Sequence, residues 1–339
     1  MCTYNGIAFL DQQLKSLTEQ TSLPLEVIVC DDGSTDGTLQ ILKQFAESAP
    51  FPVVVRKNEH KLNFTGNFFQ AASLCTGDYI AFCDQDDIWE TCKLEVVQAH
   101  IDLTHADLYV HEGLVIDEHN ESNGRIIPNL QAPTECPERP PFDQGAKGFA
   151  MVVSKVVVGD ILCNWDWAEY LKFERRFGAP FGHDLVIYAW CLDRQIVKIY
   201  QRLVRYRIHR NNTTATYEEN TSFGRRVAAR LKAVQFSNFN YTPAARKWRQ
   251  EARLLVRFKL TTCHGVGLLH RYLSESASIW GLRGRMYRNG IPFRARWRIL
   301  ILMHRRRKEI EFGRTLSFLA IVKDLLLLPL SRSKHPLKP

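Results

Sequence analysis

Two acidic motifs each follow an apolar run that is typical of a buried strand. DDGSTDG at residues 31–37 follows LEVIVC, and DQDD at residues 84–87 follows YIAFC. Carboxylates at the carboxyl ends of such strands can accept hydrogen bonds from a base or a ribose, or bind a divalent cation together with a substrate phosphate. The sequence therefore predicts a ligand site where these strands end.

Each motif also has a simpler interpretation. Asp, Gly and Ser are common turn residues, so residues 31–37 fit a capped turn equally well. For residues 84–87 a solvated turn is the weaker interpretation, because the apolar lead-in places the motif at the edge of a sheet. The three carboxylates there repel one another unless a cation or hydrogen-bond donors lie among them.

Two further motifs lie later in the chain. Gly182, His183 and Asp184 open a helical pattern, so Asp184 can be a general base that takes a proton from a hydroxyl, or simply a helix cap, which the sequence slightly favours. His209, in YRIHRNN, stands where a strand ends. It can bind a metal as a neutral imidazole, or be a surface histidine beside two turn-forming asparagines.

The elements that must position these motifs alternate between strand and helix. Apolar runs predict strands, and 3.6-residue periodicity predicts the helices between them. This rhythm predicts an α/β fold with a mostly parallel sheet and helices on both faces. The predicted strands cover residues 25–32, 51–58, 78–87, 107–117, 147–154 and 197–209, and the helices 36–48, 66–75, 90–104, 155–163, 165–177 and 182–192, with a loop at 118–144.

Composition places the chain among globular proteins. It has 339 residues, of which 45% are hydrophobic and 24% charged, and no run of 18 apolar residues that would span a bilayer. The start lacks the features of a signal peptide. Nine cysteines, an odd number without a CxxC pair, predict reduced thiols in a cytosolic protein.

Charge divides the chain into two parts. Residues 1–224 carry 19 Lys and Arg against 31 Asp and Glu, a net −12, while residues 225–339 carry 26 against 5, a net +21. We expect a domain at 1–215 and a basic helical region at 216–339. Residues 296–330 combine Trp297, apolar runs and a basic cluster, which predicts peripheral contact with an anionic membrane surface.

Other interpretations of the basic region stay open. It can be a solvated helical extension or a contact between subunits. Nucleic-acid binding ranks third, because no nucleic-acid motif is present and the front of the chain is acidic. We therefore expect no nucleic-acid partner.

Taken in order and spacing, the motifs resemble glycosyltransferase family 2 and, within it, the bacterial rhamnosyltransferase-like group. No single motif is specific, but the combination is, and it covers roughly residues 1–215. The segments that carry the resemblance are CTYNG (2–6), DDGSTDGT (31–38), FTGNF (64–68), GDYIAFCDQDDIW (77–89), KLE (93–95), GHD (182–184) and YRIHRNN (206–212).

The resemblance implies a GT-A fold and inverting transfer from a nucleotide-diphospho-sugar to a hydroxyl of a growing cell-surface glycan or a lipid-linked acceptor. It also implies Mg²⁺ or Mn²⁺ as cofactor. Asp184 would be the base, and the metal would be held by Asp86, the more direct ligand, with Asp84 and His209. The donor would be bound by Thr3, Tyr4, Asn5, Asp31, Asp32, Asp84 and Gln85.

The DQDDIW motif resembles members that use a deoxyhexose, which predicts rhamnose on dTDP, with a UDP-sugar as the other donor. Family members place an apolar strand before the CTYNG segment, and here Met1 stands where that strand should end. We therefore expect the first strand to be missing. A catalytically impaired relative that binds nucleotide-sugar or a partner protein is the alternative. A nucleotidyltransferase is disfavoured, because the amino end has no Gly-rich, basic phosphate loop.

Overall fold

The computed structural model describes residues 1–130, 147–164, 170, 182–210 and 212, with a few isolated positions between 274 and 299. The predicted helix at 165–177 and nearly all of the basic segment 296–330 lie outside the described residues. The chain divides into two compact units, of which the first comprises Met1–Thr134, Pro141–Tyr217 and Arg257–Leu268. The boundary at residue 215 stays a prediction. Within the described part, no helix combines the length and apolar character needed to cross a membrane.

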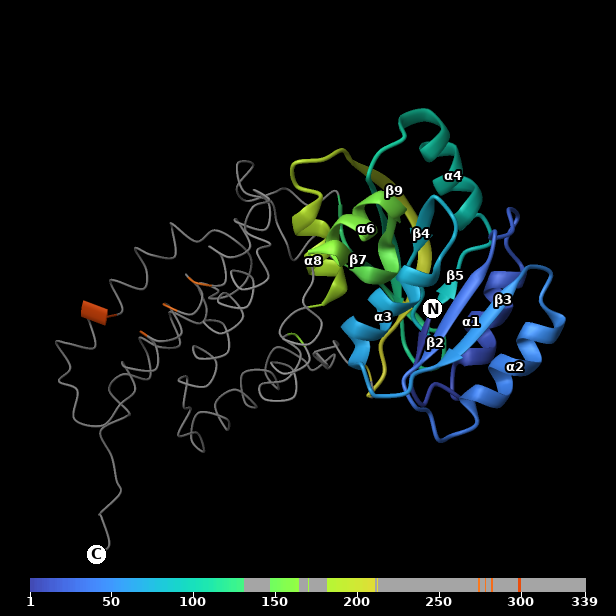
Figure 1. Ribbon diagram of the computed structural model, residues 1–339. Coiled ribbons are helices and arrows are strands. Elements are labelled where there is room, and N and C mark those ends of the chain that lie inside the picture. The colour runs from blue at the N-terminus through green and yellow to red at the C-terminus, as the bar shows by residue number, and fades with distance from the viewer. Residues whose placement is uncertain are drawn as a thin grey trace, which may run out of the picture. The chain divides into compact units, whose positions relative to one another are not determined.

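A three-stranded parallel sheet forms the amino-terminal part, in the order β1 (Cys2–Thr3), β2 (Val27–Asp31) and β3 (Val53–Lys57) (Figure 1). Every residue of β2 is buried, as its apolar run predicted. The strand expected to be missing would precede the CTYNG segment, and β1, which lies within that segment, does not test that expectation. Cys2 and Thr3 pair with β2, and the Met1 ammonium donates to the Ile28 carbonyl at 2.7 Å.

A second sheet of six strands continues beyond β1, where the Cys2 N–H donates to the Cys83 carbonyl at 3.3 Å. Only the β6–β9 pair is parallel in it, and the other pairings are antiparallel. The α/β class is as expected, but parallel pairing is confined to part of the structure, because an apolar run does not reveal strand direction. The strands are β4 (Tyr79–Ala81), β5 (Ile88–Trp89), β6 (Leu108–Ile116), β7 (Ser122–Ile127), β8 (Met151–Ser154) and β9 (Ile196–Arg207).

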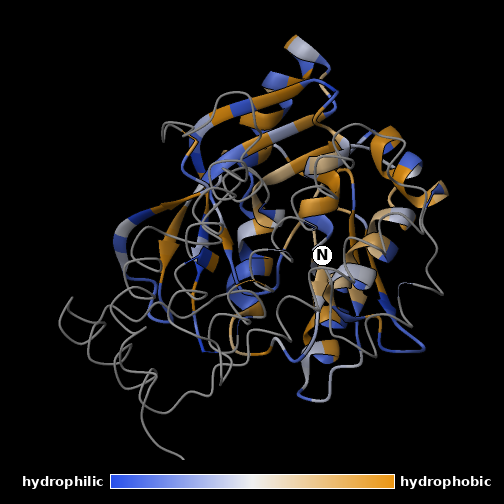
Figure 2. Ribbon diagram, turned by 90° about the vertical axis from the view of Figure 1, so that its left-hand side faces the viewer, coloured by the Kyte–Doolittle hydropathy of each residue, from blue (hydrophilic) through white to orange (hydrophobic). Residues whose placement is uncertain are grey.

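Helices pack against both faces of the parallel strands. On one face, α1 (Leu10–Thr18) and α2 (Thr38–Ser48) form a hydrophobic core with Val27 and Val29 of β2. On the other, α3 (Asn63–Leu74) meets the end of β2 at Asp32. Three helices, α3, α6 (Lys155–Cys163) and α8 (His183–Trp190), pack together, and α4 (Lys93–Thr104) packs on β9. Hydrophobic residues run along the strands, and the helices alternate hydrophobic and hydrophilic residues (Figure 2).

Candidate active site

The residues expected to bind the nucleoside come together where β1 and β2 end. Parallel strands end at the same edge of a sheet, which places Thr3 beside Asp31, and the Thr3 hydroxyl donates to Asp31 Oδ2 at 3.4 Å. The Asn5 N–H donates to Ser34 Oγ at 2.9 Å, and Asn5 Oδ1 accepts from the Thr35 N–H at 2.9 Å. These bonds join the CTYNG segment to the turn that contains DDGSTDG.

Protein donors already occupy the Asp32 carboxylate. The side-chain amide of Asn58 donates to Oδ1 at 2.9 Å, the Leu62 N–H to Oδ1 at 2.7 Å, and the Asn63 N–H to Oδ2 at 2.8 Å. Asp32, which is 5% exposed, thus anchors the loop between β3 and α3. Its contact with a nucleoside stays a prediction. The sequence carried no signal for this anchoring, because the partners lie 26 to 31 residues away.

Tyr4 is exposed next to these buried carboxylates. Tyr4 is 45% exposed, and the Lys61 ammonium lies 3.6 Å from the centroid of its ring. Gln85 holds the Tyr4 backbone by accepting from its N–H at 2.9 Å and donating to its carbonyl at 3.2 Å. A Cβ at Gly6 would lie 2.2 Å from Gln85 Oε1, so glycine is required there. Gln85 therefore joins the Tyr4 segment to the DQDD residues.

Residues 84–87, named the acid loop below, lie between β4 and β5 at the same edge. Asp86 Oδ2 lies 2.8 Å from His209 Nε2, so the structure brings together two of the residues expected to bind metal. Asp87 has no solvent exposure, and its Oδ1 accepts from the Arg207 N–H at 2.9 Å. Its Oδ2 finds no hydrogen-bond partner among the described residues.

Electrostatics connects the acid loop with Asp184. Burial, together with the charges of Asp86 and Asp184, raises the pKa of Asp84 to about 7. Burial also raises the pKa of Asp87 well above its usual value, with Asp86 and Asp84 adding to the shift. Asp184, on α8, is therefore close enough to Asp84 for their charges to interact. The carboxylates of two distant segments therefore lie within electrostatic range of one another.

A buried lysine lies beside this acidic cluster. Lys93 has no solvent exposure, and its ammonium donates to the Phe149 carbonyl at 3.1 Å and lies 3.6 Å from the centroid of the Trp89 ring. Burial lowers the pKa of Lys93 to about 7, although the charges of nearby acids oppose that shift. The lysine therefore neutralises the carboxylates only in part. The sequence showed Lys93 only as part of the KLE motif, without a role.

Asp184 begins α8 with its carboxylate close to the backbone. Its Oδ1 accepts from the Leu185 N–H at 2.8 Å, and a Cβ at Gly182 would lie 2.1 Å from that oxygen, so only glycine fits before it. The neighbouring His183 is a core residue. Its ring stacks on Phe68 with centroids 4.1 Å apart, and burial lowers the pKa of His183 to about 4, which keeps it neutral.

The acid loop fits a divalent cation that shares its coordination with substrate. In the described part of the chain no cluster of three or more His, Cys, Asp or Glu side chains could hold a metal by itself. Mg²⁺ and related hard ions usually take one or two protein carboxylates and complete their shell with phosphate and water. Asp86 and His209 supply two candidate ligands, and the pKa of Asp84 is raised by burial and then by the charges of Asp86 and Asp184, a repulsion that a cation would relieve.

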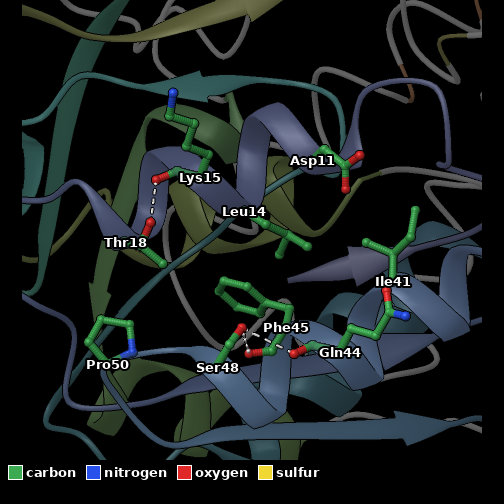
Figure 3. A pocket seen from close by; sticks show the side chains of 9 residues that line it. All are labelled: Asp11, Leu14, Lys15, Thr18, Ile41, Gln44, Phe45, Ser48 and Pro50. Carbon is green, nitrogen blue, oxygen red and sulfur yellow. Dashed lines mark hydrogen bonds between the residues drawn. The ribbon is translucent and has the colours of Figure 1, made fainter.

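An open groove between α1 and α2 contains none of these residues (Figure 3). In it, the Thr18 hydroxyl donates to the Lys15 carbonyl at 2.8 Å. The groove is thus separate from the candidate active site. Its lining residues are Asp11, Leu14, Lys15, Thr18, Ile41, Gln44, Phe45, Ser48 and Pro50.

Comparison with known proteins shows which family the chain matches. The model of the family described as "Glycosyl transferase family 2" matches residues 1–154. A dTDP-rhamnosyl transferase, RfbG of Shigella flexneri, is 28% identical over 220 residues, which are 62% of this chain and 72% of the relative. The putative glycosyltransferase EpsE of Bacillus subtilis is 33% identical over 146 residues, or 43% of this chain and 52% of EpsE.

The fold also matches a solved structure, TarS 1–349 of S. aureus in complex with UDP-GlcNAc. The TM-score is 0.50 at 17% sequence identity, and the match covers 91% of this chain and 86% of that one. At this identity the likeness concerns the fold alone, which is the GT-A fold expected from the sequence. Residues 1–154 are therefore a glycosyltransferase family 2 domain, and the chain that carries them is a glycosyltransferase.

Proposed function

We propose that this chain transfers a sugar, with inversion, from a nucleotide-diphospho-sugar to a hydroxyl of a growing cell-surface glycan or a lipid-linked acceptor. Rhamnose carried on dTDP is the donor that we favour. The DQDDIW motif and the 28% identity to a dTDP-rhamnosyl transferase support it. A UDP-sugar is the other donor to test, because a fold relative is bound to UDP-GlcNAc.

The observation that carries this proposal is that the charges of both Asp86 and Asp184 act on Asp84. Transfer to a hydroxyl requires a base for the acceptor and neutralisation of the leaving diphosphate. Asp184 comes from α8 and Asp86 from the acid loop, yet the charges of both act on Asp84. Groups suited to the two tasks are thus within electrostatic reach of each other.

Asp184 takes the proton of the attacking hydroxyl. It lies in the first turn of α8, where the helix dipole favours a negative charge, and the Leu185 N–H holds one carboxylate oxygen. Packing of His183 against Phe68 fixes the start of the helix and, with it, the direction of the Asp184 side chain. As the hydroxyl attacks the anomeric carbon, the bond from that carbon to the diphosphate oxygen breaks.

Asp86, Asp84 and His209 hold Mg²⁺ or Mn²⁺. When bound, that ion neutralises the charge that develops on the departing diphosphate. His209 orients Asp86 through the 2.8 Å contact, and Gln85 keeps the acid loop next to Tyr4. The exposed Tyr4, together with Thr3, Asn5, Asp31 and Asp32, forms the nucleoside side of the site.

The acceptor side belongs to the same proposal. A lipid-linked acceptor at the cytoplasmic face of a membrane suits the basic composition of residues 296–330, which would lie on anionic headgroups. The match to the glycosyltransferase family 2 model supports transfer to an acceptor hydroxyl. The linkage is left to the assay.

The test is Asp184→Asn, measured with a panel of dTDP- and UDP-sugars in the presence of Mn²⁺. We expect turnover to fall by about 10²–10⁴-fold, because the amide cannot take a proton, while donor affinity measured by calorimetry stays unchanged. Asp102→Asn is the matched control, since Asp102 is an exposed aspartate on α4 that accepts only from Gln98.

Two results would contradict the proposal. An Asp184→Asn protein that keeps most of its turnover would show that Asp184 is not the base. A wild-type protein that binds a nucleotide-sugar but transfers nothing to any glycan acceptor would favour the catalytically impaired relative instead.

A further inference from the structure

The acid loop is held from inside the protein by Arg207, a residue of the YRIHRNN segment to which the sequence assigned no role. Arg207 is the largest side chain without solvent exposure among the described residues. It ends β9, two residues before His209. A buried guanidinium needs its donors satisfied, so the partners of Arg207 reveal its role.

Each of those partners comes from a different segment. Arg207 Nε donates to the backbone carbonyl of Asp86 at 2.8 Å, Nη1 to the carbonyl of Asp117 at 3.0 Å, and Nη2 to Gln12 Oε1 at 2.8 Å. The Arg207 N–H also donates to the carboxylate of Asp87 at 2.9 Å. One residue thus fixes the acid loop to α1 and to the turn after β6.

The same arginine aligns the two side chains expected to bind metal. The Phe9 ring lies 4.6 Å from the Arg207 guanidinium carbon, and its centroid lies 4.8 Å from that of the His209 ring. Because the Asp86 backbone is held by Arg207 and its carboxylate meets His209, the position of Asp86 is fixed at both ends.

We propose that Arg207 is a positioning residue that sets the acid loop in place for the cation. The proposal rests on the proposed function in taking Asp86 and His209 as metal ligands. The planar fork of the guanidinium is essential, because it reaches three acceptors in fixed directions, which a lysine ammonium on a flexible stem does not reproduce.

The main test is Arg207→Lys, which keeps the charge and removes the fork. We expect Mn²⁺ affinity, measured as free Mn²⁺ by electron paramagnetic resonance, to fall about 10–100-fold, as for the loss of an outer-shell partner. Turnover at saturating Mn²⁺ should change far less than the Mn²⁺ concentration that gives half-maximal rate. Backbone amide exchange in residues 82–90 should become at least about tenfold faster, while that in β2 stays unchanged.

The matched control is Arg205→Lys, two residues earlier on the same strand. Arg205 pairs with Glu90 at 2.8 Å, and its side chain is 46% exposed. We expect this variant to leave both Mn²⁺ affinity and exchange in the acid loop, residues 84–87, unchanged.

Gln12→Ala is a second variant that tests the proposal even if the Arg207→Lys protein does not fold. Gln12 is an exposed residue of α1, so its loss is tolerated, yet it removes one acceptor of the guanidinium. We expect the same changes as for Arg207→Lys, but smaller.

Three outcomes decide the proposal. Unchanged amide exchange in residues 82–90 in both Arg207→Lys and Gln12→Ala would overturn it. So would a general loss of stability with unaltered Mn²⁺ affinity, since that describes a purely structural residue. A wild-type protein that binds no Mn²⁺ would contradict the metal assignment of the proposed function, whereas the exchange measurement would still decide whether Arg207 positions the loop.

Discussion

The two acidic motifs look alike in sequence and differ in how the fold treats their charge. In the turn at residues 31–37, partial burial would raise the pKa of Asp36, but hydrogen bonds from Thr38 and Ile7 outweigh it and the pKa is lowered. Asp32 accepts three hydrogen bonds. In the acid loop, burial and the charges of neighbouring acids together raise the pKa of Asp84 to about 7.

This difference separates a structural use of carboxylates from a catalytic one. Carboxylates that accept hydrogen bonds from several protein donors have their hydrogen-bonding capacity filled by the protein, and they hold loops in place. Carboxylates that repel one another in a partly buried loop are electrostatically incomplete, so they have the strongest tendency to bind a cation. The acid loop, and not the more conspicuous DDGSTDG turn, is therefore the expected metal-binding part of the site.

The largest effect expected from this contrast is on catalysis. Asp86→Ala removes the carboxylate that faces His209, and with it the charge neutralisation that a bound cation provides, worth several kcal/mol. We expect Mn²⁺-dependent transfer to fall by more than about 100-fold, and donor affinity to become insensitive to EDTA. Asp36→Ala, in the turn at residues 31–37, should lower activity less than about tenfold. Similar losses in both variants would remove the distinction between the two motifs.

A smaller effect is expected on folding stability, and it separates Asp32 from Asp87. Asp32→Asn weakens three hydrogen bonds to a charged acceptor, so we expect the free energy of unfolding to fall by about 1.5–3 kcal/mol. Asp87→Asn should change it by less than about 0.5 kcal/mol, because burial raises the pKa of Asp87 and so already disfavours its charged form, and an amide oxygen can accept from Arg207. Urea unfolding at pH 7 measures both, and a larger loss in Asp87→Asn would reverse the comparison.

The third expected effect is a pH dependence of folding stability with a defined sign. The pKa of Asp84 is raised in the folded protein, so its contribution to stability is complete below its unfolded value near 4 and is lost as pH rises to about 7. Burial lowers the pKa of His183 to about 4 in the folded protein. Its contribution to stability therefore increases as pH rises from 4 to 6.5. The difference in stability between Asp84→Asn and wild type isolates Asp84.

We expect that difference to shift in favour of Asp84→Asn as pH rises from 4 to 7, by at most about 1.4 kcal/mol per pH unit in metal-free protein. A flat difference across this range would mean that Asp84 is ionised throughout. Above pH 7, added Mn²⁺ should stabilise wild type and leave Asp84→Asn less affected, because cation binding needs the deprotonated carboxyl.

Regular patterns allowed much of the fold to be predicted from the sequence. The buried strand β2, the long strand β9 and the helix that opens at His183 all carry apolar periodicity, and the structure has them where expected. The strand β7, within the predicted loop at 118–144, was missed. Its residues Ser122–Ile127 are mostly exposed on the edge of the sheet, so they show no hydrophobic pattern.

For the site, the sequence by itself determined which residues stand at the ends of the strands, because apolar runs and the acids after them are local features. Tertiary structure alone decided which acids are already paired and which are not. The donors to Asp32 lie 26 to 31 residues away, and Arg207 lies 121 residues from Asp86. The state of a carboxylate depends on burial and on partners from distant segments, and both arise only when the chain folds.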